Sequence, residues 1–212
     1  MIRSWKSREA RAVFEGRMPK GFPADLVRAT RRRLERLDAA ATVEDLRVPP
    51  GHRLHKLGDD RAGHFVKKDG GRSVSTTSSA SASSGAPTAP SRSSSWTIIE
   101  EAPMTATATA HDYTTFAEPL AHPGAHLRED FLPDYGLTPG ALARAMGLKD
   151  RTRIERLVRE QQPVTPDTAL RLARVFGTTA EFWMNLQTQH DLSKAAIAGR
   201  DELAAIVRLK VG

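Results

Sequence analysis

The segment from Thr138 to Arg156 constrains the fold of this chain more than any other. Thr138 followed by Pro139 favours the start of a helix, because a threonine hydroxyl accepts free backbone amide hydrogens and proline suits the first helical position. The apolar residues that follow share one helical face: Leu142, Ala143 and Met146. Gly147 can end this helix in the left-handed conformation. The segment therefore predicts two short helices joined by a tight turn.

The second helix of this pair is basic. Asp150 is expected to cap its N-terminus, with Ile154, Leu157 and Val158 facing inward. A basic helix held by a partner helix across a glycine-containing turn is what enters the DNA major groove in helix-turn-helix proteins. The expected DNA-binding residues are Thr138, Arg151, Thr152, Arg153 and Arg156. Arginines pair with guanine edges or phosphates, and a helix N-terminus such as that at Thr138 favours phosphate.

The alternative interpretation is an exposed, solvated helix face with no ligand. Arg156 is the residue most open to this interpretation, because Glu155 and Glu160 lie close enough along the chain to pair with it.

Composition excludes several classes of protein. The chain has 212 residues, of which 39% are hydrophobic and 6% aromatic, which is a small supply for one large core. The absence of cysteine excludes disulfides, thiolate metal sites and cysteine nucleophiles, and fits a cytoplasmic location. We find no run of about 18 apolar residues, which would indicate a membrane span. The seven histidines show no zinc-site spacing, so we expect no metal and no cofactor.

The positive charge is unevenly distributed. Residues 1–72 carry 18 Lys/Arg against 10 Asp/Glu, whereas residues 127–212 carry 13 against 11. A basic segment favours polyanions such as nucleic acid, although a solvated basic helix face explains the charge equally well.

The C-terminal half contains five helical patterns between residues 122 and 194. They begin near Pro123, Thr138, Asp150, Thr165 and Thr179. Phe182 and Trp183 are expected in the core, with Trp183 also placed to touch a partner subunit. Residues 195–212 form an expected amphipathic helical tail.

This half resembles HigA-type antitoxins of the Xre (lambda-repressor-like) family. The resemblance is carried by G-L-T-P-G-A-L-A-R-A-M-G-L, V-T-P-D-T-A-L-R-L-A-R-V-F-G-T and E-F-W-M-N-L-Q-T-Q-H-D-L. It implies a five-helix DNA-binding domain that dimerises on operator DNA and binds a cognate toxin. The sequence departs from the family at Pro139 and Gly140, where a glutamine is frequent.

The N-terminal third resembles the HigB branch of RelE-type toxins over residues 1–65, through S-W-K and G-H-R-L-H-K-L-G-D-D-R-A-G. The resemblance implies a small α+β ribonuclease fold. The later strands and the catalytic tail of that family are missing, so residues 1–72 are interpreted as a truncated toxin segment. Arg53, His55 and Lys56 are interpreted as remnants of RNA-phosphate contacts, and no catalytic residue is assigned.

Residues 73–121 are rich in Ser, Ala, Thr and Pro and are expected to be a disordered linker. Free back-translation of part of this tract permits toxin-like strands in a neighbouring frame. This suggests a toxin gene that slipped frame and reads into an antitoxin gene starting near Met104. The alternative is an ordinary serine-rich linker.

Taken together, the sequence predicts a mainly α-helical protein with an incomplete α+β segment at its N-terminus. The expected function is a homodimeric, non-enzymatic antitoxin and autorepressor in the cytoplasm. Its expected partners are operator DNA and a HigB-like toxin, or the chain's own N-terminal segment. The alternatives are a fusion that still cleaves mRNA on the ribosome and a non-functional read-through product.

Overall fold

The computed structural model describes Ile2, Trp5, residues 7–49, residues 111–207 and Leu209, together with the backbone of three short strands. The chain divides into two compact units, one of Met1–Gly51 with Thr105–Gly212 and the other of His52–Met104. The described residues of the first unit form helices and their connections, without strands. The mainly α-helical fold expected from the sequence is therefore confirmed.

The second unit contains a three-stranded antiparallel sheet in the order β1–β2–β3. Its strands are β1 (Leu54–Lys56), β2 (His64–Lys67) and β3 (Ile99–Glu100). His55 and Lys56 belong to β1, but their side chains and the whole of Arg53 lie outside the described residues. The tract from Ser73 to Ser95 also lies outside them, so the truncated-toxin and frame-slip hypotheses stay predictions.

The N-terminal segment forms three helices: α1 (Arg8–Phe14), α2 (Ala24–Ala39) and α3 (Val43–Arg47). The Ser7 hydroxyl accepts the amide hydrogen of Ala10 at 3.1 Å and so caps α1. At α3, Thr42 and Asp45 form a capping box, in which each side chain bonds to the backbone of the other.

The C-terminal half forms all five predicted helices. The first consists of α4, one π-helical turn (η4) and α5, and the other four are α6 to α9. Three of the starts use the same device, because the hydroxyls of Thr138, Thr165 and Thr179 each accept an amide hydrogen three residues later. The elements are η3 (Tyr113–Thr115), α4 (Pro123–His126), η4 (Leu127–Phe131), α5 (Leu132–Asp134), α6 (Pro139–Ala145), α7 (Thr152–Val158), α8 (Pro166–Phe176), α9 (Ala180–Ala198) and α10 (Arg200–Ala205).

One apolar cluster forms the core of these helices. The Phe131 ring lies 5.0 Å from Phe176 and 4.8 Å from Trp183, centroid to centroid. Helices α6, α7 and α8 contribute fully buried side chains to the same cluster: Leu142, Ile154, Leu157 and Leu172. Trp183 is itself fully buried, and its Nε1 donates to Thr178 Oγ1 at 2.8 Å. The expected contact of Trp183 with a partner subunit is therefore wrong.

A second apolar cluster joins the N-terminal helices to the residues that precede α4. Its buried members are Val13, Phe14, Leu34, Phe116 and Leu120. The disordered linker predicted to reach residue 121 is therefore wrong for residues 111–121, which include η3 and two buried side chains. The physical reason is that Phe116 and Leu120 supply the apolar area that the Ser/Ala/Thr tract lacks.

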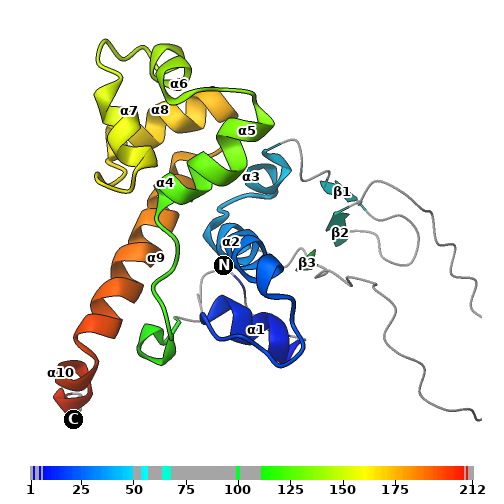
Figure 1. Cartoon of the computed structure of the whole chain (residues 1–212), viewed down its shortest axis with the longest axis vertical. Helices are drawn as coiled ribbons and strands as arrows, with labels where there is room; N and C mark the ends of the chain where they lie inside the picture. Colours follow the sequence, from blue (N-terminus) through cyan, green and yellow to red (C-terminus); the bar gives the residue numbers. More distant parts are fainter. Residues whose placement is uncertain are drawn as a thin grey trace, which may run out of the picture. The chain divides into compact units, whose positions relative to one another are not determined.

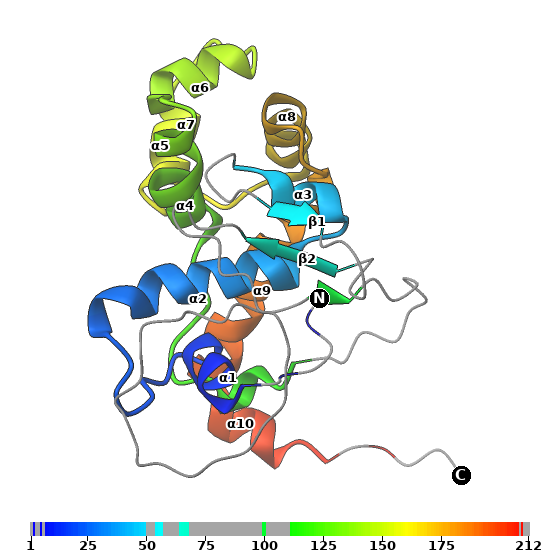
Figure 2. The ribbon, with the colours of Figure 1, turned by 90° about the vertical axis from the view of Figure 1, so that its right-hand side faces the viewer.

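Helix α9 extends from the C-terminal core towards the C-terminal end of the chain, and α2 packs across it (Figure 1, Figure 2). The helix of the predicted tail ends at Ala205, and the apolar residues beyond it are exposed, Ile206 by 71% and Leu209 by 90%. A search of the described helices finds none with the length and apolar character needed to cross a membrane.

Candidate nucleic-acid interface

Helices α6 and α7 form the helix pair that the sequence predicts. Thr138 Oγ1 accepts the Ala141 amide hydrogen at 3.2 Å at the start of α6. Gly147 ends that helix with a φ of 70°, in the left-handed region that favours glycine. The Asp150 carboxylate accepts the Thr152 amide hydrogen at 2.8 Å, but the N-cap of α7 is Arg151, one residue later than the sequence predicts. Hydrogen bonds from Thr152 lower the pKa of Asp150.

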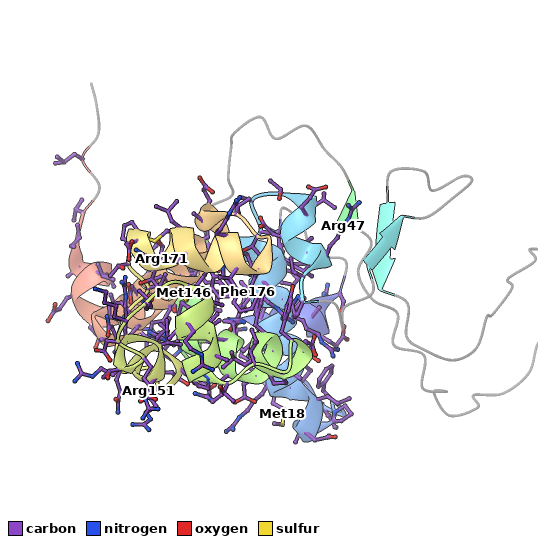
Figure 3. The ribbon with its side chains drawn as sticks, turned by 90° about the horizontal axis from the view of Figure 1, so that it is seen from above. Met18, Arg47, Met146, Arg151, Arg171 and Phe176 are labelled. Atoms are coloured by element: carbon purple, nitrogen blue, oxygen red, sulfur yellow. The ribbon has the colours of Figure 1, made fainter. Side chains whose placement is uncertain are left out.

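The outward face of α7 presents two arginines to solvent. Arg151 has 74% of its side chain exposed and points away from the molecule (Figure 3), with its Nε 3.2 Å from Glu155. Arg156 is also exposed. Glu155 contacts Arg151, and Glu160 contacts Arg128 at 2.9 Å, so neither forms the ion pair with Arg156 that the sequence allowed.

Arg153 is placed differently from the other predicted DNA-binding residues. Its guanidinium donates to Asp167 at 2.7 Å, to Thr165 Oγ1 at 2.8 Å and to Thr168 Oγ1. Only 27% of its side chain is exposed. Arg153 therefore joins α7 to the first turn of α8 in this structure.

A second arginine connects α8 to the end of α6. Arg171 lies beside Met146 (Figure 3), and its guanidinium donates to the Met146 carbonyl at 2.8 Å. Its Nε donates to Asp167 at 3.1 Å. The hydrogen bonds from Arg153 and Arg171 lower the pKa of Asp167. We call Arg153, Asp167 and Arg171 the Asp167 network; through it, α8 holds both helices of the pair.

A concavity of about 380 Å³ opens between the start of α6 and the outward face of α7. Three arginines and one glutamate line it, so it favours anions. Sequence reasoning missed Arg144 and Arg159 because it considered only the start of the first helix and the outward face of the second. The lining residues are Thr138, Pro139, Gly140, Arg144, Arg151, Glu155, Val158 and Arg159.

Helix α4 packs closely against α7. A Cβ atom on Gly124 would lie 1.9 Å from the Leu157 carbonyl oxygen, so only glycine permits this approach. Arg128 donates to the Val158 carbonyl at 2.7 Å. Contacts from α4, η4 and α8 therefore fix the position of α7.

The chain matches known proteins through part of its length. It is 49% identical over 77 residues to Virulence-associated protein I of Dichelobacter nodosus, covering 36% of this chain and 70% of that protein. It is 39% identical over 69 residues to antitoxin HigA-1 of Vibrio cholerae, covering 32% of this chain and 64% of that protein, which is less than two thirds. No family model matches the chain.

Among solved structures, the antitoxin HigA of Pseudomonas aeruginosa with the higBA promoter is 39% identical. The match covers 44% of this chain and all of that one, with a TM-score of 0.41. Over part of its length, the chain belongs to the family of Virulence-associated protein I, and it is similar to antitoxin HigA-1.

Proposed function

We propose that this chain is a sequence-specific DNA-binding antitoxin that represses its own operon in the cytoplasm. The observation that carries the proposal is the paired arrangement of α6 and α7, with Arg151, Thr152 and Arg156 on the outward face of α7. The kinship with helix-turn-helix regulators and HigA-type antitoxins supports it.

The exposed and partly exposed side chains of α6 and α7 suggest a division of roles. Arg151, Thr152 and Arg156 contact the base edges and the flanking phosphates. Thr138, Arg144 and Arg159, around the concavity, contact phosphate and set the register of the protein on DNA. Two copies bind two half-sites about one helical turn apart, and the second copy is the expected partner in a homodimer.

The test is binding to the DNA upstream of the chain's own coding sequence, with a shuffled duplex of the same length as control. We expect the native duplex to bind at least about 1,000-fold more tightly. Both affinities are expected to fall as salt rises, because phosphate contacts release counterions. Equal affinity for the two duplexes at every salt concentration would refute the proposal.

The N-terminal segment is proposed to be an inactive toxin remnant. Two of the relatives are named as an HTH-type transcriptional regulator of Haemophilus influenzae and as antitoxin HigA-1 of Vibrio cholerae. The full-length chain, added to a translation reaction, is expected to leave the mRNA intact. Cleavage of mRNA that depends on ribosomes would instead favour a fusion with retained endonuclease activity.

A further inference from the structure

The C-terminal helices have a core that is nearly complete without the N-terminal helices. Among the described residues of that core cluster, only Ala39 and the partly buried Val48 come from α2 and from the end of α3. The N-terminal helices contribute to a second cluster, in which Val13, Phe14 and Leu34 pack with Phe116 and Leu120 of the chain before α4. Within this one compact unit, α1–α3 and the residues from 111 onwards, which we call the N-terminal and C-terminal bodies, therefore meet through a shared apolar cluster outside the C-terminal core.

Three buried carboxylates hold the two bodies together, and each meets donors from the C-terminal half. Asp45 accepts both the Thr179 amide hydrogen at 2.6 Å and the Thr179 hydroxyl at 2.9 Å, at the N-terminus of α9. Asp38 accepts from Gln189 Nε2 at 2.8 Å and contacts His111 at 2.9 Å. All these acceptors lie on α2 or α3, so the N-terminal body presents a defined set of acidic groups.

Glu35 completes the acidic set. Its carboxylate accepts the Ala121 amide hydrogen at 3.1 Å and lies 3.3 Å from His126 Nε2. Burial alone would raise the pKa of Glu35, but the contacts with His126 and Arg31 outweigh burial and leave that pKa lowered. The carboxylates of Glu35, Asp38 and Asp45 are each only 1% exposed. A buried carboxylate needs such partners, because an unpaired one is strongly destabilising.

Further polar contacts surround these three. Arg32 donates to Asp130 on η4 at 3.2 Å, and the buried Arg36 lies 3.5 Å from the same carboxylate. Asn185 on α9 donates to the Ala39 carbonyl at 2.9 Å. This density of paired, desolvated polar groups is typical of a specific protein–protein interface.

We propose that α1–α3 is a tethered protein ligand of the C-terminal half. The surface made by residues 111–126 and α9, which we call the docking surface, recognises a helical polypeptide that presents the carboxylates of Glu35, Asp38 and Asp45. In this chain the docking surface is filled by the segment that the chain itself carries. The match with Virulence-associated protein I covers 36% of this chain, so about two thirds lies outside that relationship.

The experiment places a protease site within Ser73–Ser95 of the full-length chain and cuts it after folding. We expect the two fragments to co-elute in size-exclusion chromatography at micromolar concentration. In the Asp38→Asn/Asp45→Asn double variant, the dissociation constant of the cut chain is expected to rise by about 100-fold or more. The matched control is Asp25→Asn/Glu44→Gln, which alters exposed acids on the same two helices and is expected to change the constant less than about twofold.

A second measurement tests cis occupancy of the docking surface. A fluorescent copy of the released N-terminal fragment should exchange into the cut chain and stay excluded from the intact chain, because the tether gives the resident segment a millimolar effective concentration. Three results would overturn the proposal. They are separation of the parent fragments on cutting, loss of helical circular dichroism by the isolated C-terminal fragment, and equal constants for test and control variants. None of these outcomes depends on DNA binding.

Discussion

Charged side chains are buried at the docking surface and exposed on the outward face of α6–α7. Where the N-terminal body meets the docking surface, Asp38 and Asp45 are 1% exposed, and each accepts a hydrogen bond from the C-terminal body. On the α6–α7 face, Arg151 is 74% exposed and its ion pair with Glu155 is open to solvent. Buried pairs are costly to break, whereas exposed pairs contribute little to stability and remain available to a ligand. The comparison separates residues that hold the molecule together from residues that can bind a partner.

The largest expected effect comes from Gly124→Val, because α4 contacts both regions. The valine side chain would collide with the Leu157 carbonyl and force α4 away from α7. We expect the free energy of unfolding to fall by about 3 kcal/mol or more, and DNA binding to fall with it. Urea denaturation measures the first effect. The exposed Ala195→Val in α9 is the control, and an equal loss in both variants would contradict the predicted collision.

Asp45→Ala tests the contact at the docking surface. It removes the acceptor that bonds to Thr42 at the start of α3 and to Thr179 at the start of α9, and we expect a loss of about 2–3 kcal/mol in unfolding free energy. Its neighbour Glu44 has 65% of its side chain exposed, so Glu44→Ala is expected to cost less than about 0.5 kcal/mol. Urea denaturation measures both losses of unfolding free energy. Similar losses in the two variants would contradict the prediction that the buried acid contributes more to stability than the exposed one.

Arg151→Ala/Arg156→Ala tests the α6–α7 face alone. We expect operator affinity to fall by about 30-fold or more, since each lost arginine contact is worth about 1–3 kcal/mol. The unfolding free energy is expected to stay within about 0.5 kcal/mol of the parent. Fluorescence anisotropy of labelled operator and urea denaturation give the two values. A stability loss without an affinity loss would reverse the roles assigned to this face.

Asp167→Asn distinguishes two roles for Arg153 by the sign of the effect. If Arg153 positions α7, weakening the Asp167 network reduces the ratio of operator to shuffled-DNA affinity, and we expect a drop of about 3- to 10-fold. If Arg153 instead contacts DNA, its release from Asp167 raises operator affinity. An increase in operator affinity, measured by fluorescence anisotropy, would therefore favour direct contact of Arg153 with DNA.

The smallest expected effect is a pH dependence at His122. Burial, with the charge of His190, lowers the pKa of His122 to about 4. His122 Nδ1 accepts the Gly124 amide hydrogen at 3.0 Å, which only the neutral ring can do. Stability from this group is therefore complete above about pH 6.5 and is lost as the pH falls towards 4.

The full shift in pKa would correspond to about 3 kcal/mol, and solvent screening of this incompletely buried ring reduces the predicted loss at His122 to about 1 kcal/mol between pH 7 and pH 4. His122→Asn is expected to flatten this part of the profile of unfolding free energy against pH. The lowered pKa of Glu35 adds a further loss below about pH 4.5, which the variant should retain. A parent profile that is flat from pH 7 to pH 5 would contradict the assignment.

The sequence predicted the C-terminal helices well because their signals are local. Thr138, Thr165 and Thr179 mark helix starts, and Gly147 marks a helix end, without reference to distant residues. The candidate DNA-binding residues were found in the same way, from the start of one helix and the outward positions of the next.

The contacts of those residues could not be predicted, since they depend on tertiary neighbours. Arg153 looks like Arg151 in the sequence, and only the position of Asp167 on α8 separates the two. The role of residues 111–121 was missed for the same reason. Phe116 and Leu120 are isolated apolar residues in a polar tract until Phe14 and Leu34, far earlier in the chain, cover them.

Helix α9 contacts the C-terminal core with its first turns and the N-terminal body with later turns. The amide hydrogens of these two parts should therefore exchange with solvent at different rates. Phe182, Trp183 and Leu186 belong to the C-terminal core, so the amides of this stretch exchange only when that core unfolds globally. The next turns carry Gln189 and Ser193, which bond to α2 and to the chain just before α4. Departure of the N-terminal body would expose these turns first. One continuous helix would then show two protection classes, and the boundary between them would mark where the first body ends and the second begins.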